Sequence, residues 1–284
     1  MWPTWQQGAV LALVCLLGVV ALRRRPASPR RDVALPVLRE VSLLAGLYAV
    51  WRIARTLPFA SEDGAIGRAR RIDDLQQWLH LPTELSLQHF ALAHEWVGRV
   101  LNWYYAIVHV PATLAFLVWL FVRHRDVYPR WRNALAMVTG ACLVIRFVRV
   151  APPRFLTDLG YVDLATTFGW SVYGPVGTGV SDQFAAMPSI HVGWAAVVSF
   201  GIVAASTSRW RWLFMSHLVL TMLAVSATGN HWWMDGLVAI ALLAAALWVD
   251  TKAFASRRVR REAVVEPVVA VTAVTAAGES LTSR

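Results

Sequence analysis

Residues 229–250 read GNHWWMDGLVAIALLAAALWVD, and this stretch decides the fold class. His231 and Asp235 stand four residues apart, which is one helical turn, and an apolar run long enough to cross a membrane follows them. A second stretch, residues 187–205, reads MPSIHVGWAAVVSFGIVAA and places His191 at the start of another apolar run. Ionisable groups beside hydrocarbon are costly and usually functional. The two stretches therefore predict a membrane protein with a polar site at the membrane surface.

The composition agrees with a membrane protein. Hydrophobic residues make up 57% of the chain, charged residues only 15%, and the mean hydropathy is +0.49, whereas a soluble chain carries about 25% charged residues. Seven apolar runs are long enough for spans of about 20 residues, and they lie at 5–22, 36–55, 100–122, 134–150, 189–205, 212–228 and 233–250. We expect an all-α, polytopic membrane helix bundle with a six-helix catalytic core and one N-terminal anchor helix.

The basic residues predict the orientation of these spans. Lys and Arg collect in cytoplasmic loops, and a chain with its N-terminus outside has sixteen of them in inner segments but four in outer ones. The inner residues are Arg23, Arg24, Arg25, Arg30, Arg31, Arg123, Arg125, Arg130, Arg132, Arg209, Arg211, Lys252, Arg257, Arg258, Arg260 and Arg261, and the outer ones are Arg68, Arg70, Arg71 and Arg154. We therefore predict an outer N-terminus and a cytoplasmic C-terminus. This distribution accounts for the formal charge of +10 without a nucleic-acid partner.

Polarity divides the chain into three regions. Residues 1–35 hold the anchor span and a basic inner loop; the arginines follow the span, whereas in a signal peptide they precede it. Residues 36–250 form the predicted catalytic membrane domain. Within it, segment 58–96 is too polar to cross the membrane and is expected to form an outer amphipathic helix pair broken at Pro82. Residues 251–284 form a basic and then disordered cytoplasmic tail.

The residues predict neither a metal nor a cofactor. Cys15 and Cys142 lie inside apolar runs, and neither has the Cys or His neighbours of a zinc site. No cluster of carboxylates offers the oxygen ligands that magnesium prefers. Any chemistry therefore depends on the two quoted stretches and on the arginines near them.

The predicted topology brings both histidines to the outer surface. His191 opens the span at 189–205, His231 follows the span at 212–228, and Asp235 begins the last span. A neutral imidazole can attack phosphorus when a carboxylate holds its other nitrogen, so His231 with Asp235 is the candidate nucleophile. His191 can protonate the departing alkoxide and later deprotonate the incoming hydroxyl. These residues predict phosphoryl transfer through a phosphohistidine.

Four further residues are candidates to bind the phosphate: Arg154, Ser189, Arg146 and Arg149. Arginine supplies a planar fork of donors, and the start of a helix at Ser189 supplies backbone N–H groups. Arg154 follows two prolines in an outer loop, where we expect an exposed side chain. The alternative for Ser189 is the N-cap of its helix, and for Arg146 and Arg149 it is anchoring at the headgroups.

Other polar and aromatic residues have structural interpretations. His109 lies inside the run at 100–122, where a buried hydrogen bond between helices is the expected role. His217 is placed on the inner half of its span. Trp232 and Trp233 are assigned to an aromatic belt at the outer boundary of the membrane, with the lining of a lipid entry as the alternative.

Two motifs resemble those of a known superfamily. Pro188-Ser189-Ile190-His191 resembles the Pro-Ser-Gly-His motif of the type 2 phosphatidic acid phosphatase superfamily, and His231-Trp232-Trp233-Met234-Asp235 resembles its final His-x-x-x-Asp motif. Ala151-Pro152-Pro153-Arg154 and Gly229-Asn230-His231-Trp232 look similar to a bacterial branch related to inositol phosphorylceramide synthases. The resemblance covers about residues 60–250. It implies a six-helix core of the phosphatase type, in the bacterial plasma membrane, that acts on a phospholipid or lipid phosphate from the outer face.

The chain departs from the superfamily pattern at its basic residues. The superfamily places an Arg six residues before its last histidine, where this chain has Val225. It also has a Lys seven residues before an Arg-Pro pair, whereas Arg146 and Arg154 are eight apart and the prolines come first. These departures are similar to the inositol-phosphoryl transferase branch.

The residues leave two questions open. Water as the acceptor would make a phosphatase, and an alcohol such as inositol would make a phosphotransferase. The alternative from a different class is a non-catalytic membrane transporter or channel. Such a protein would place polar residues at mid-depth in several spans, where this sequence has few ionisable groups.

Overall fold

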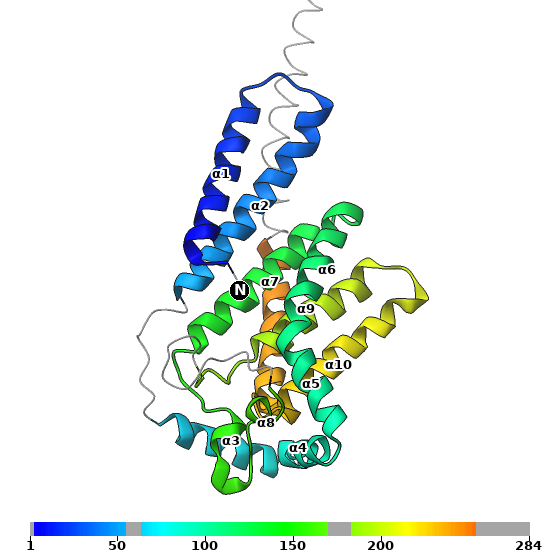
Figure 1. Ribbon diagram of the computed structural model, residues 1–284. Helices are drawn as coiled ribbons and strands as arrows, with labels where there is room; N and C mark the ends of the chain where they lie inside the picture. Colours follow the sequence, from blue (N-terminus) through cyan, green and yellow to red (C-terminus); the bar gives the residue numbers. More distant parts are fainter. Residues whose placement is uncertain (1–2, 55–63, 170–182, 254–284) are drawn as a thin grey trace, which may run out of the picture.

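The computed structural model describes residues 3–54, 64–169 and 183–253, and these residues are helical throughout apart from their connecting loops, as predicted (Figure 1). Each apolar run of the sequence coincides with one or two helices. These are α1 (Trp5–Arg23), α2 (Pro29–Ala54), α5 (Glu95–Ile107), α6 (His109–Arg123), α7 (Tyr128–Ile145), α9 (Ile190–Ala205), η3 (Arg209–Phe214) with α10 (Met215–Ala227), and a last helix, Trp233–Ala253, drawn in orange. Residues 254–284, the bulk of the predicted tail, lie outside the described residues.

Several of these helices are long and apolar enough to cross a membrane. In the described residues four qualify: α1, α2, the continuous helix Arg209–Ala227 and the last helix. The pair α5 and α6 makes a fifth if it is one span with a bend of 50°. Helix α9 is apolar but has only 16 residues. The structure thus agrees with a multi-pass membrane protein, while the count of six core helices and one anchor stays a prediction.

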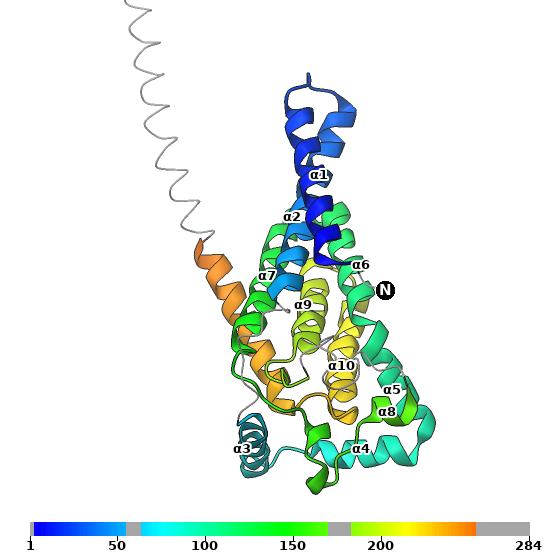
Figure 2. The same ribbon diagram turned by 60° about the vertical axis from the view of Figure 1, so that its left-hand side comes forward.

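Helices α1 and α2 form a hairpin that projects from the rest of the bundle (Figures 1 and 2). Helix α2 lies along α7. Near one end Glu40 forms an ion pair with Arg132 at 2.7 Å, and near the other Arg146 Nη2 donates to the Ala54 carbonyl at 2.8 Å. Because residue numbers rise together along both helices, α2 and α7 run in the same direction, as the predicted topology requires.

Helix α9 lies in the middle of the bundle and packs against α6, α7 and α10. In membranes, small residues at helix interfaces let backbones approach closely. A Cβ atom at Gly201 would overlap the ring of Phe116 on α6, and one at Gly193 would lie 2.8 Å from Val138 Cγ1 on α7. The two glycines therefore allow this packing, which fixes the helix that carries His191.

Three shorter helices close one end of the bundle (Figure 2). They are α3 (Ala65–Trp78), α4 (Glu84–Ala93) and α8 (Leu164–Phe168), and Pro82 lies in the break between α3 and α4. Helices α3 and α4 carry buried polar side chains. Gln88 donates to the carbonyls of Ala227, at the end of α10, and Val162 at 3.2 and 3.0 Å. The predicted outer pair of helices, α3 and α4, is thus hydrogen-bonded to the helix bundle through buried side chains.

The assignment of Trp232 to an outer aromatic belt is wrong. Its side chain is fully buried, and its Nε1 donates to the Ala151 carbonyl at 3.0 Å. The ring also stands edge-to-face against Tyr161, with centroids 5.9 Å apart. The loop between α7 and α8 covers this tryptophan, so its polar N–H finds a partner inside the protein.

Candidate active site

The end of α10 brings His231 into position. Gly229 has a φ of +69°, a left-handed conformation that suits glycine, and the N–H groups of Asn230 and His231 both donate to the Val225 carbonyl at 3.1 Å. The chain therefore turns sharply out of α10. Asp235 then lies in the first turn of the last helix, and Ser189 N donates to its backbone carbonyl at 3.1 Å.

The three predicted catalytic residues lie together. The ring centroids of His191 and His231 are 5.8 Å apart, and His231 Nδ1 is 3.4 Å from Asp235 Oδ2. His191 lies in the first turn of α9. Two separate stretches of the chain, the start of α9 and residues 231–235, thus meet at the same end of the bundle.

The ring of His231 is held at one nitrogen. Its Nδ1 lies 2.6 Å from the Ala186 carbonyl oxygen and 3.4 Å from Asp235 Oδ2. A carbonyl only accepts hydrogen bonds, so Nδ1 carries the proton. The other nitrogen, Nε2, is buried and has no hydrogen-bond partner among the described residues. This tautomer leaves the lone pair of Nε2 available for a nucleophilic attack.

Asp235 is fully buried, and its side chain contacts two groups near the start of the last helix. Its Oδ2 accepts a hydrogen bond from the Trp232 backbone N–H at 2.8 Å and faces His231 Nδ1. The first N–H groups of a helix have no partner within it, and here the side chain of Asp235 supplies one. The carboxylate therefore ties the orientation of His231 to the start of the last helix.

The next two N–H groups of this helix are bound by the closing helices α3 and α4. Trp233 N donates to Glu84 Oε1 at 2.8 Å, and Met234 N donates to Gln76 Oε1 at 3.0 Å. Gln76 Nε2 also donates to Glu84 Oε1 at 2.9 Å. Burial raises the pKa of the Glu84 carboxyl from 4.5 to about 7, because the hydrogen bonds only partly offset its desolvation.

Ser189 is the N-cap of α9. Its Oγ accepts from the Val192 backbone N–H at 3.4 Å, and its carbonyl accepts from Gly193 N at 3.0 Å. The side chain is fully buried beside the site. The capping alternative is therefore observed, and contact between Ser189 and a phosphate stays a prediction.

The expectation of an exposed Arg154 is wrong. The residue lies in a 3₁₀ turn, Pro153–Phe155, and is only 3% exposed. Its backbone N–H donates to the Gly229 carbonyl at 3.0 Å, its Nη1 donates to Asn230 Oδ1, and its Nε lies 3.6 Å from Asp163 Oδ2. The stiff turn after the prolines folds back under the segment that precedes His231. The guanidinium consequently lies inside the protein and next to the site.

Residues 70–249, well over half of the chain, match the family model of the PAP2 superfamily. The chain belongs to the PAP2 superfamily. Membership indicates a membrane enzyme of the phosphatase or phosphotransferase type, and the match includes every candidate residue of the site. Comparisons with curated proteins and with solved structures found no match. The narrower resemblance to the inositol phosphorylceramide synthase branch is not confirmed by the family match.

Two arginines of this PAP2 chain bond to other helices. Arg146 is 8% exposed and donates to α2 through Ala54, and the Arg149 carbonyl accepts from Arg68 Nε at 2.5 Å. These contacts hold α2 and α3 to the end of α7. A phosphate-binding role for Arg146 or Arg149 stays a prediction.

The sequence pattern does not reveal several polar groups of the PAP2 site. They are the Ala186 carbonyl, the Asn230 amide, Gln76 and Glu84. Asn230 stands directly before His231, so its position was a usable signal. Ala186 stands three residues before Ser189, but a backbone carbonyl leaves no side-chain signal, and Glu84 reaches the site from 149 residues away in the chain.

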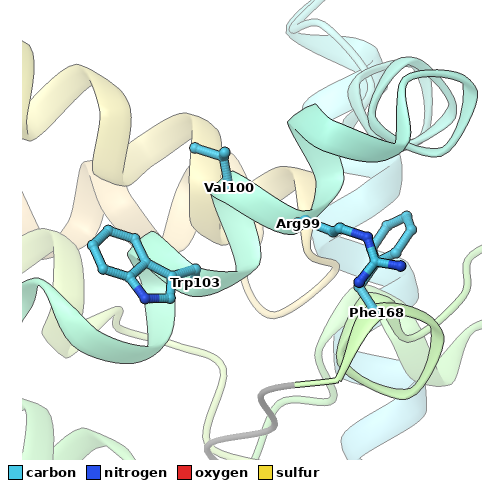
Figure 3. A pocket seen from close by; sticks show the side chains of 4 residues that line it. All are labelled: Arg99, Val100, Trp103 and Phe168. Atoms are coloured by element: carbon cyan, nitrogen blue, oxygen red, sulfur yellow. The ribbon is translucent and has the colours of Figure 1, made fainter.

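Two surface grooves lie away from these residues. One has a volume of about 270 Å³ and is shown in Figure 3, where the Arg99 guanidinium lies beside the Phe168 ring; it is lined by Arg99, Val100, Trp103 and Phe168. The other has a volume of about 470 Å³ and is lined by Arg209, Trp210, Trp212 and Leu213. Neither lining includes a residue of the PAP2 site.

Proposed function

We propose that the chain transfers a phosphoryl group from a lipid-linked phosphate ester, at the extracytoplasmic face of the membrane, through a phosphohistidine on His231. The observation that carries the proposal is the state of the His231 ring. Its Nδ1 faces two oxygen acceptors, and its Nε2 is buried with no hydrogen-bond partner among the described residues. The neighbouring ring of His191, 5.8 Å away, supplies the acid and base.

In the first step the lone pair of His231 Nε2 attacks phosphorus. The N–P bond forms as the P–O bond to the lipid breaks. The electron pair of the broken bond goes to the leaving oxygen, which takes a proton from His191. The positive charge that develops on the His231 ring is stabilised at Nδ1–H by Asp235 and by the Ala186 carbonyl.

In the second step an acceptor hydroxyl attacks the phosphorus of the phosphohistidine. His191, now neutral, takes the proton of the acceptor, and the electron pair of the N–P bond returns to Nε2. Both histidines are then in their starting states. Water as the acceptor releases free phosphate, and an alcohol such as inositol forms a new phosphate ester, as the resemblance to the inositol-phosphoryl transferase branch implies.

Arg154 is the first candidate to bind the phosphate oxygens. It is bonded through Gly229 to the segment that carries His231, and a guanidinium offers two parallel donors to a phosphate. An incoming phosphate would compete with Asp163, which lies 3.6 Å from Nε at a partly exposed position. Ser189 is the second candidate, and Arg146 and Arg149 follow.

The test is trapping of the phosphoenzyme. Purified protein in detergent is mixed with phospholipids radiolabelled in the headgroup phosphate, quenched, and analysed for label that is stable in base and lost in acid. We expect label on the wild type and on His89→Ala, which removes an exposed histidine of α4, and none on His231→Ala. Released products with and without inositol then distinguish free phosphate from a new phosphate ester of inositol. Full labelling of His231→Ala, or no turnover of any phospholipid, would overturn the proposal.

A further inference from the structure

Four histidines form a row that starts at the candidate active site. The ring centroids of His231 and His191 are 5.8 Å apart, those of His191 and His109 5.1 Å, and those of His109 and His217 5.9 Å. They come from the last loop, α9, α6 and α10. In the described ranges no group of three or more His, Cys, Asp or Glu is arranged to hold a metal ion. A metal site therefore does not account for the row of histidines in this part of the chain.

Each ring nitrogen of His109 has an oxygen within hydrogen-bonding distance. Its Nδ1 lies 3.2 Å from the Tyr105 carbonyl, and its Nε2 lies 3.2 Å from Thr221 Oγ1 on α10. The Thr221 hydroxyl is itself placed by the His217 carbonyl, 2.7 Å away. The His109 side chain is only 3% exposed, so a rotation of its ring would break a buried hydrogen bond. The bond to α10 agrees with the buried interhelical role expected for His109.

His191 packs directly on this ring. His109 meets it edge-to-face at an interplanar angle of 76°, and Tyr105 lies on another side with its centroid 4.5 Å away. Rotation about χ2 of a histidine is broad and is not set by the side chain itself. Its neighbours must therefore set the direction in which each nitrogen of His191 points. Tyr105 and His109, both buried, are two of these neighbours.

We propose that His109 is a positioning residue for His191, holding the imidazole in the orientation from which it donates a proton to the leaving oxygen. The proposal rests on the proposed function. It concerns proton donation alone, so its signature is a loss that depends on the leaving group. An alkoxide needs the proton to depart, whereas 4-nitrophenolate departs without one.

The experiment measures kcat/KM for the 4-nitrophenyl and dodecyl esters of the phosphate that the wild type transfers. This parameter reports the first step, in which His191 acts as the acid. His109→Ala should lose about 100-fold on the dodecyl ester, the lower range for removing a general acid, and about 3-fold or less on the nitrophenyl ester. His109→Phe, which restores an aromatic wall, should recover part of the loss. His191→Ala serves as the reference. Its kcat/KM should also fall much more on the dodecyl ester than on the nitrophenyl ester, and the loss on the dodecyl ester should be larger than that of His109→Ala.

The matched control is Phe116→Ala. Phe116 is a buried residue of the same helix and packs against the same partner, α9. Its removal damages packing without touching His191, so both esters should lose activity equally. Equal losses in His109→Ala would show a merely structural role and overturn the positioning proposal. If His191→Ala itself is unselective, or the wild type transfers neither ester, the proposed function is wrong and the positioning proposal fails with it.

Discussion

The carbonyl oxygen of Ala186 lies 2.6 Å from Nδ1 of His231, closer than the carboxylate oxygen of Asp235 at 3.4 Å. Two acceptors from different segments thus face one N–H group. In catalytic triads where the carboxylate alone orients the histidine, its replacement by an amide costs about 10⁴-fold because the ring takes the wrong tautomer. The Ala186 carbonyl excludes that tautomer here, because it cannot donate a hydrogen bond.

We therefore predict a moderate loss for Asp235→Asn. The asparagine oxygen can still accept from Trp232 N, and the ring keeps its proton on Nδ1. We expect kcat/KM for lipid phosphate to fall about 10- to 100-fold, less than in a triad oriented by the carboxylate alone. Steady-state assays in mixed micelles measure this. A loss as complete as that of His231→Ala would mean that Asp235 alone fixes the ring.

Arg154 variants should lose both activity and stability. The guanidinium is buried and bonded to Asn230, so Arg154→Ala leaves buried polar groups without their partner, at a cost of about 3 kcal/mol in the free energy of unfolding. The loss of a donor to the phosphate should lower kcat about 100-fold. Arg154→Lys keeps the positive charge but loses the planar pair of donors. Its stability and its kcat should therefore lie between those of the wild type and those of Arg154→Ala.

Thermal unfolding in detergent and steady-state kinetics test these variants. The control is Arg70→Ala, because Arg70 is an exposed arginine at the same end and pairs with Asp158. Exposed pairs contribute little to stability, so this variant should resemble the wild type. If Arg154→Lys keeps the wild-type kcat, Arg154 stabilises the fold and does not bind the phosphate through its guanidinium. The phosphate site would then depend on Arg146 or Arg149.

Glu84 predicts a pH dependence of stability. Its pKa is raised from 4.5 to about 7 on folding, so between these pH values the folded chain holds a proton that the unfolded chain has lost. Stability therefore falls as the pH rises through this window, by about 3 kcal/mol in total. Glu84→Gln removes the titration but keeps an acceptor for Trp233 N.

The variant should match the wild type near pH 4.5 and unfold at a higher temperature at pH 8. Thermal unfolding followed at several pH values measures the difference. Glu95→Gln is the control, because Glu95 is an exposed carboxylate that pairs with Arg99 on α5. Parallel pH curves for Glu84→Gln and the wild type would refute the assignment to Glu84.

The predicted orientation can be tested with single cysteines. Thr166, on α8, and Thr207, between α9 and η3, are both exposed and lie on opposite sides of the membrane in the predicted topology. In whole cells an impermeant thiol reagent should label Thr166→Cys but not Thr207→Cys. Native Cys15 and Cys142 are buried and give a low background. The reverse labelling pattern would place the site in the cytoplasm.

The apolar runs determined the helices, because the need to satisfy backbone groups in a membrane leaves helices or closed barrels as the only spanning structures. The four-residue spacing of His231 and Asp235 likewise determined their proximity, since His231 stands two residues before the last helix and Asp235 lies in its first turn. The apolar runs and this spacing are local features, so the sequence alone reveals them. The positions of the basic residues predict an orientation of the spans, and that orientation stays a prediction.

Contacts between distant segments were decided only by the tertiary structure. Glu84 meets Trp233 across 149 residues, the Ala186 carbonyl meets His231 across 45, and Arg154 is buried by a segment 76 residues away. No periodicity links such residues, because their approach depends on how loops and helices pack. For the same reason, His109 and His191 give no sign in the sequence that their rings touch, and only the packing of α6 against α9 brings them together.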